Sequence, residues 1–137
     1  MTLVLNDAVR RLLDTPHPAV LTTLNPDGSP QSSVIWVSRD GDELLISTER
    51  DRAKARNIAR DGRVGLTVFD LADPYLYAEI RGSATLTEDA DRAVAARIAT
   101  EYVGAEAAKE YQDTSDGAVR VVVRITPTKV LGSAAKA

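Results

Sequence analysis

The sequence predicts a mainly β protein built as a small antiparallel barrel, and three observations support this fold class. Short apolar segments recur along the chain, and strong turn signals such as Asn25-Pro26-Asp27-Gly28 and Asp40-Gly41-Asp42 separate them. Most of these segments are linked too closely for a helix to connect them, which favours hairpins over a doubly wound parallel sheet. The length of 137 residues suits one domain, so residues 1–137 are expected to form a single unit of about six antiparallel strands with helices.

The first half of the chain is expected to hold one helix and three strands. Asn6 is a candidate N-cap for a helix with an apolar face that includes Val9 and Leu12, and Pro16 ends this helix. The alternation of apolar and polar residues and the turns between them predict strands over residues 19–24, from about 31 to 38, and 43–48.

The second half begins with a short helix over residues 53–60 and a strand over 63–69. The next strand, over residues 75–86, contains Gly82, where we expect a bend or a bulge. Thr87 is a candidate cap for a helix with an acidic first turn. This helix has an apolar stripe of Val94, Ile98 and Tyr102. A segment of helical tendency follows over residues 104–117. The final strand covers residues 120–125 and continues over 129–131 beyond Pro127.

The composition excludes several classes of function. The chain has no cysteine and one histidine, so disulfides, Cys–His catalysis and a multi-histidine metal site are impossible. His17 lies between two prolines and is interpreted as a loop histidine. We therefore predict no catalytic side chain and no metal site, and we expect a bound cofactor to carry any reaction. The net charge of −3 argues against nucleic-acid binding. The N-terminus resembles neither a signal peptide nor a membrane span, so a cytoplasmic protein is the default expectation.

The most basic segment runs from residue 50 to residue 63. It holds six Lys or Arg residues and two Asp residues, a net charge of +4 within a chain of −3. Positive side chains in a first helical turn oppose the helix macrodipole, which favours anions there. One interpretation is a solvated helix face with i,i+4 pairs. The other is a corner between a strand and a helix, where Arg52 and Lys54 converge on an anion and Ser47 and Thr48 add hydroxyls.

Three more residues have both a structural and a functional interpretation. Trp36, the only tryptophan, either packs in the core or faces a ligand. Asn57 can tie the basic helix to a neighbouring backbone. Tyr77 shares a strand face with Tyr75, and such residues stack on a flat ring or pack at an interface.

The order and spacing of several segments resemble the pyridoxamine 5′-phosphate oxidase-like split β-barrel flavoproteins, in the branch of flavin- and deazaflavin (F420)-dependent oxidoreductases. The resemblance covers nearly the whole chain, and its most specific part is the Arg-x-Lys-x-x-Asn unit between two strands. The segments that carry it are residues 19–24, 27–31, 46–48, 52–58, 61–64 and 80–84.

The resemblance implies a cofactor at the interface of a homodimer, with its phosphate held where the third strand meets the following helix. Arg52 and Lys54 match the phosphate-binding basic residues, and Ser47 and Thr48 match positions along the phosphate and ribityl chain. The strand along the tricyclic ring is matched by Ser33, Val34, Ile35 and Trp36. Arg56 and Asn57 match the basic motif, and Tyr77 matches a residue that the partner subunit contributes.

Two departures separate this chain from the oxidases of the vitamin pathway. It lacks their C-terminal Arg-Leu-x-Pro-like pattern, and it has Ser33 where they carry an arginine. The resemblance therefore favours a reductase that uses coenzyme F420 and transfers a hydride between the deazaflavin and a flat, electron-poor organic substrate. The alternatives are an FMN-binding pyridoxamine phosphate oxidase-like protein, a flavin or deazaflavin carrier without turnover, and a small-barrel interaction domain without a cofactor.

Overall fold

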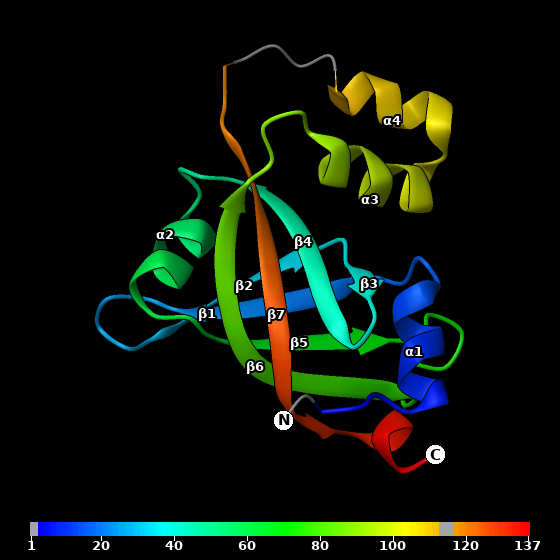
Figure 1. The fold of residues 1–137 in the computed structure, drawn as a ribbon. Helices are drawn as coiled ribbons and strands as arrows, with labels where there is room; N and C mark the ends of the chain where they lie inside the picture. The colour runs from blue at the N-terminus through cyan, green and yellow to red at the C-terminus, as the bar shows by residue number, and fades with distance from the viewer. Residues whose placement is uncertain (1–2, 113–116) are drawn as a thin grey trace.

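The computed structural model describes residues 3–112 and 117–137 and contains one antiparallel sheet of seven strands in the order β2-β1-β5-β6-β7-β4-β3 (Figure 1). In chain order the described elements are α1 (Asp7–Asp14), β1 (Ala19–Leu24), β2 (Pro30–Ile35), β3 (Ser38–Asp40), β4 (Glu43–Glu49), α2 (Ala53–Arg60), β5 (Arg63–Phe69), β6 (Tyr77–Glu88), α3 (Ala93–Val103), α4 (Ala105–Gln112), β7 (Arg120–Leu131) and the 3₁₀ helix η1 (Ser133–Lys136). The predicted mainly β, antiparallel barrel class is confirmed.

The two edge strands of the sheet are neighbours in the sequence. β2 pairs with β1, β3 pairs with β4, and only Trp36 and Val37 separate β2 from β3. The two ends of the sheet therefore lie close together, and the sheet curls into a barrel. The prediction of one strand over residues 31–38 is wrong for this reason: the chain changes pairing partner at Trp36, and this produces seven strands in place of six.

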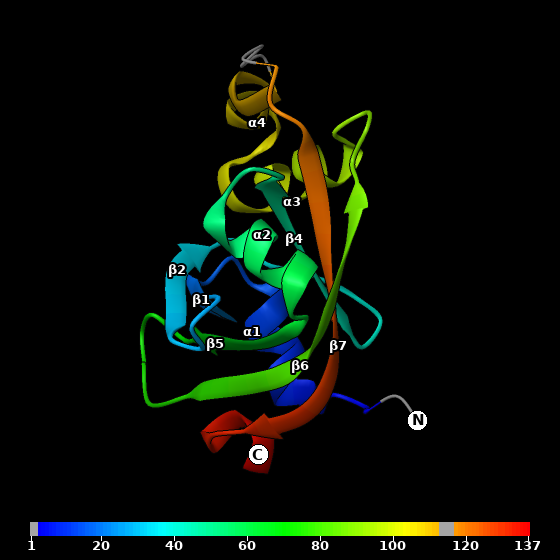
Figure 2. The same ribbon diagram turned by 90° about the vertical axis from the view of Figure 1, so that its left-hand side faces the viewer.

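The two longest strands, β6 and β7, run side by side and join the two halves of the barrel (Figure 2). Their register shifts between Arg81 and Gly82, so that Arg81 pairs with Lys129 while Gly82 pairs with Pro127. The expected irregularity at Gly82 is therefore confirmed as a β-bulge. The expected interruption at Pro127 is absent, since β7 continues through this residue, which lies at the bulge and has no N–H to pair.

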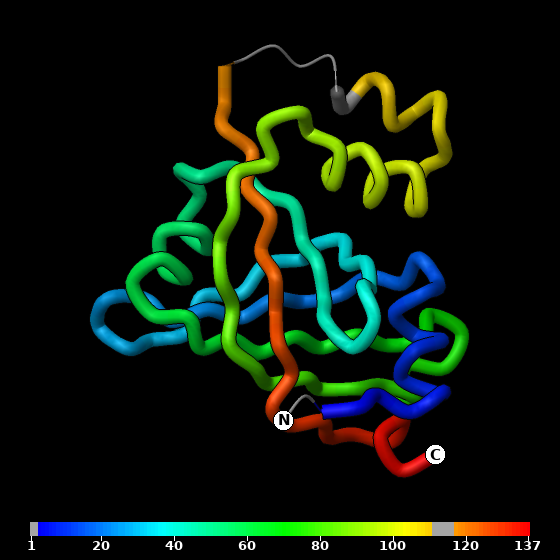
Figure 3. Tube along the Cα trace, viewed as in Figure 1, coloured from blue at the N-terminus to red at the C-terminus, as the bar shows by residue number. Residues whose placement is uncertain are grey.

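The helices cover different parts of the barrel, as the tube trace makes clear (Figure 3). α1 is capped by the Asn6 side chain, as predicted, and its apolar face joins the main core, which also contains the inward residues of β1, β4, β5, β6 and β7. A second, smaller core lies between α3 and the outer face of β4 and β7, where Ile98 contacts Leu45 and Val122. The predicted stripe of Val94, Ile98 and Tyr102 faces this smaller core.

The start of α3 differs from the prediction. Thr87 lies inside β6, and the helix begins six residues later at Ala93. The carboxylate of Asp89 accepts the backbone N–H groups of Val94 and Ala95, so this buried acid takes the capping role expected of Thr87. The helical tendency predicted over residues 104–117 corresponds to α4 up to Gln112, and residues 113–116 lie outside the described part of the chain.

Candidate functional site

The corner between β4 and α2 has the features of an anion site. Arg52 is the N-cap of α2, with an extended backbone, and no side chain caps the helix. The first turn contains no acidic residue. The first-turn N–H groups, which no side chain caps, and the positive end of the macrodipole can therefore serve an external acceptor.

Lys54 links this corner to β2. Its Nζ lies 3.3 Å from Oγ of Ser33, a residue 21 positions earlier in the sequence. Ser33 pairs with Leu21 of β1 in the middle of β2. The fold thus brings together two residues that the sequence assigns to one ligand, one as a phosphate-binding cation and the other as part of the strand along the ring.

The charge on Lys54 is poorly compensated. Its pKa is lowered from 10.5, first by burial of the ammonium group and second by the positive charge of Arg52. Within residues 3–112 and 117–137, no carboxylate oxygen lies within 4.0 Å of Nζ. A half-buried cation beside a second cation is unfavourable in the free protein, and a bound anion would remove this cost.

The other basic residues of the segment divide into two groups. Arg52 is 65% exposed and pairs only loosely with Glu49, at 3.8 Å, so its guanidinium can reorient. Arg56 is exposed and lines an open groove together with Arg50. Arg60 instead donates to the carbonyl of Leu24 and to Oδ1 of Asn57, which fixes the end of α2 against β1.

Asn57 is buried, with 3% of its surface exposed. Its Nδ2 donates to Oγ1 of Thr23 at 3.0 Å and to Oδ1 of Asn25 at 3.1 Å. The amide therefore ties α2 to β1 through side chains, in place of the backbone contact that the sequence suggests. In this position Asn57 holds the helix that carries Lys54.

Ser47 and Thr48 point to opposite faces of β4. Thr48 is buried with the inward residues of the strand, such as Leu44 and Ile46, because side chains alternate along a strand. Ser47 lies on the outer face, beneath α3, and its Oγ is buried without a hydrogen-bond partner. The sequence places both hydroxyls along one ligand, and the strand separates them.

The residues predicted along the ring also differ in environment. Ile35 is buried in the main core, whereas Val34 is 71% exposed on the outer side of edge strand β2. Trp36 lies just beyond β2 and stacks on Tyr102, with ring centroids 5.2 Å apart and planes 13° from parallel. Tyr102 accepts from the N–H of Val37, so this pair fixes the link between β2 and β3 to α3. Tyr77, predicted to serve a partner subunit, begins β6 and is 39% exposed.

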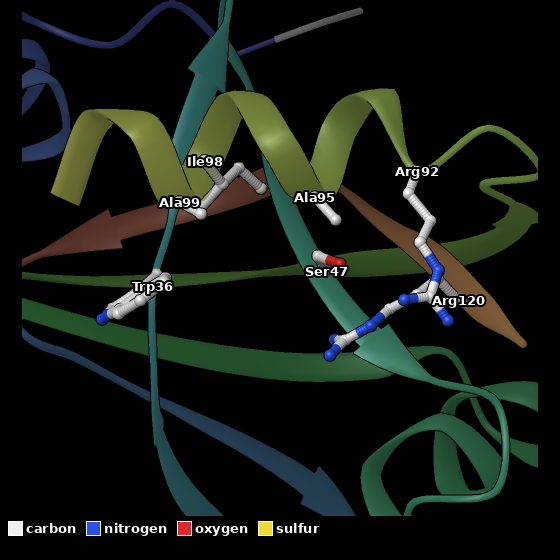
Figure 4. A pocket seen from close by; sticks show the side chains of 7 residues that line it. All are labelled: Trp36, Ser47, Arg92, Ala95, Ile98, Ala99 and Arg120. Carbon is white, nitrogen blue, oxygen red and sulfur yellow. The ribbon is translucent and has the colours of Figure 1, made fainter. Parts of the chain in front are cut away.

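A small cavity beneath α3 contains two arginines that the sequence analysis missed. Its volume is about 70 Å³, and Ala95, Ile98 and Ala99 of α3 form its apolar wall. Figure 4 shows Arg92 and Arg120 entering it from one side, with Ser47 between them and Trp36. Arg92 has φ of 57°, a left-handed conformation found at no other non-glycine residue in the described part of the chain. No sequence pattern pairs these arginines, because one precedes α3 and the other begins β7.

Comparison with known proteins places this geometry in a family. The model of the pyridoxamine 5′-phosphate oxidase family matches residues 5–134. The chain belongs to this family. An F420 reductase is 29% identical, with a TM-score of 0.80, over 93% of this chain and 98% of that protein.

Solved structures of lower sequence identity share the fold of this chain. General stress protein 26 of Bacillus anthracis is 19% identical over 90% of this chain and 89% of its own, with a TM-score of 0.66. HupZ of group A Streptococcus is 18% identical over 94% of each chain, with a TM-score of 0.65. The resemblance inferred from the sequence motifs is confirmed at the level of family and fold.

The site offers binding and orientation more than side-chain chemistry. Within the described ranges there is no group of three or more His, Cys, Asp or Glu side chains that could hold a metal ion. None of the described helices is both long enough and apolar enough to cross a membrane. The corner brings together Lys54, Arg52 and the hydroxyl of Ser33, which bind anions, and Glu49 pairs loosely with Arg52 there.

Replacing Ser47 tests whether its hydroxyl is indeed unsatisfied. Because Oγ is buried without a partner, we expect Ser47→Ala to raise the free energy of unfolding by about 1 kcal/mol. Ser38→Ala is the matched control, since Ser38 is also buried on a strand but donates to Glu101 at 3.2 Å. Denaturant titration of both variants is the measurement, and a loss of stability in Ser47→Ala equal to that in Ser38→Ala would contradict the assignment.

Proposed function

We propose that this protein is an F420-dependent reductase that transfers a hydride between the deazaflavin and a flat, electron-poor organic substrate. The observation that carries the proposal is the corner at Lys54: a half-buried ammonium group in contact with Ser33 and without a carboxylate partner in the described ranges. The phosphate group of a cofactor needs a positively charged donor, and this ammonium group can supply it.

The residues of the corner fit the cofactor in kind. Lys54 and Arg52 bind the phosphate with the N–H groups of the first turn of α2, and Ser33 orients Lys54. Asn57 holds α2 against β1 and so keeps Lys54 in position. The segment from Ser33 to Trp36 runs beside the ring. Reduced F420 supplies the hydride, and the protein orients the substrate and excludes water.

Two observations favour F420 over FMN. The first is the similarity to an F420 reductase over almost the full length of both chains. The second is the pair of arginines near the corner, Arg50 and Arg56, which line one open groove together with Asp51 and Glu88. F420 carries a phosphodiester and an oligoglutamate tail, which offer these two arginines more anionic partners than the single terminal phosphate of FMN does.

We further propose that the protein acts as a cytoplasmic homodimer with the cofactor at the interface. β2 is an edge strand, and Val34 on its outer side is 71% exposed. A second copy would cover this side chain and bring its own Tyr77 to the ring. Exposed apolar side chains on an edge strand are otherwise a liability for aggregation.

Parallel titrations with F420 and FMN test the proposed cofactor. Fluorescence of Trp36, the only tryptophan, reports binding, and oxidation of reduced F420 by quinones and enones reports turnover. We expect F420 to bind at micromolar concentration and to be oxidised. Micromolar binding of FMN without binding of F420 would overturn the cofactor assignment, and binding of F420 without turnover of any acceptor would indicate a carrier.

The lowered pKa of Lys54 predicts that cofactor binding weakens at alkaline pH. An anion binds the protonated form, so affinity falls as the pH rises through a pKa that lies below 10.5. The unfolded chain binds more protons than the folded one in this range, so the stability of the free protein rises with pH there. We expect opposite trends in affinity and in free energy of unfolding. Lys54→Arg, whose guanidinium stays charged, is expected to lose the alkaline fall in affinity.

A further inference from the structure

The cavity beneath α3 has the chemistry of a second oxyanion site, separate from the corner at Lys54. Arg120 has one ion pair in the described ranges, with Glu49 at 3.8 Å, which is too long for a hydrogen bond. Its guanidinium donors are therefore available on the cavity side. Glu49 also pairs with Arg52, so one carboxylate faces two guanidinium groups.

Arg92, the residue just before α3, brings a second guanidinium group to the same cavity. Its Nη2 donates to the carbonyl of Ala118 at 3.0 Å, which anchors the side chain beside the start of β7. Its backbone is held in the left-handed region at φ of 57°, a conformation that costs energy for a residue with a Cβ. Strained backbone of this kind is found at ligand sites, where it aims a side chain.

The shape and the wall of the cavity restrict what it can hold. A volume of about 70 Å³ is several times what one water molecule needs. One carboxylate or phosphate group fits this space, whereas a whole cofactor does not. Ser47 supplies an unpartnered hydroxyl in the wall, and Trp36 with Ala95 and Ile98 supplies an apolar border.

We propose that this cavity binds the carboxylate or phosphate group of a small ligand, held by Arg92 and Arg120 with Ser47 as an additional donor. A single guanidinium group can bind such an oxyanion through two parallel hydrogen bonds, and two guanidinium groups supply more donors. Because Trp36 lines the cavity and directly follows β2, the strand assigned to the ring, the oxyanion belongs either to an acidic substrate or to the tail of the cofactor. The choice between these two sources rests on the proposed function, whereas binding of the oxyanion does not.

Titration of the cofactor-free protein with inorganic phosphate, followed by Trp36 fluorescence, tests the proposal. We expect a saturable change that Arg120→Gln weakens about tenfold or more. Arg120→Lys keeps the charge but loses the planar set of guanidinium N–H donors, so we expect it to weaken phosphate binding less than Arg120→Gln does. Lys129→Gln removes the same charge from an exposed position on the same strand and is expected to leave the titration unchanged. Thermal unfolding of each variant identifies any loss of folding.

One further variant, Lys54→Met, separates this cavity from the corner. The Trp36 response to phosphate is expected to survive Lys54→Met. Its loss in Lys54→Met together with its persistence in Arg120→Gln would overturn the proposal, because phosphate would then bind only at the corner. An equal effect of Lys129→Gln and Arg120→Gln would also overturn it, since it would indicate general electrostatic attraction.

The same titration in the presence of saturating F420 distinguishes the two sources. An unchanged response to phosphate assigns the cavity to the acid group of a substrate, and competition between phosphate and F420 assigns it to the cofactor tail. If F420 does not bind at all, the proposed function fails, while the phosphate titration of the free protein still decides whether the cavity is an oxyanion site.

Discussion

Lys54→Met is expected to weaken binding of F420 by about ten- to a hundredfold while leaving the fold intact. A hydrogen bond to a charged group contributes about 1.5–3 kcal/mol, and each 1.4 kcal/mol is a factor of ten in affinity. In the free protein the ammonium group is half-buried, lies beside Arg52 and has no carboxylate partner among the described residues. Removing it therefore does not lower the melting temperature. Fluorescence titration and thermal unfolding measure the two effects on the same samples.

The control for this variant is Lys129→Met, which makes the same chemical change at an exposed position on β7. Both the affinity for F420 and the melting temperature are expected to stay at the wild-type values. Equal affinities of Lys54→Met and Lys129→Met would show that Lys54 does not hold the phosphate. A melting temperature well below wild type in Lys54→Met would assign this residue a structural role.

Gly82→Ala is expected to destabilise the protein by about 3 kcal/mol, the upper end for overpacking of a closely packed site. A Cβ at position 82 would lie 2.4 Å from the carbonyl oxygen of Thr126 and 3.0 Å from Cγ2 of Ile125. The obstacle at the shorter distance is backbone, so relief requires movement of β7 relative to β6. Because these strands join the two halves of the barrel, such a movement destabilises the whole fold. Urea denaturation gives the free energy of unfolding.

Gly65→Ala is the matched control for Gly82→Ala. Gly65 lies in the neighbouring strand β5, and a Cβ there would meet no atom within 4 Å. Its stability is expected to change by about 0.5 kcal/mol or less, as for other surface substitutions. Comparable destabilisation by the two variants would contradict the account of the bulge.

The sequence predicts local features well wherever one segment contains the whole signal. The cap at Asn6, the helix that carries Lys54 and the irregularity at Gly82 all depend on residues near each other in the chain. The break at Trp36 could not be predicted in this way. Apolar residues continue through it, and only the pairing of β2 with β1 and of β3 with β4 divides the segment.

The candidate site follows the same rule. The basic segment was predicted from charge and spacing, and the family resemblance assigned Lys54 and Ser33 to different parts of one ligand, whereas the direct contact between them appears only in the fold. The cavity beneath α3 was missed because Arg92 and Arg120 are 28 positions apart and converge only through the packing of α3 on β4 and β7. Ser47 was assigned to the ribityl chain from its position at a strand end, whereas the alternation of side chains along β4 directs it toward this cavity.

The central claim is that the corner of Ser33 and Lys54 holds the phosphate of a deazaflavin. The most direct test is the identity of the chromophore that remains with the protein after purification from a host that makes both F420 and FMN. Absorption spectra and mass spectrometry of the released small molecule are expected to show F420 with the wild-type protein and none with Lys54→Met. Recovery of FMN from the wild-type protein, or of F420 from both proteins in equal amounts, would contradict the claim.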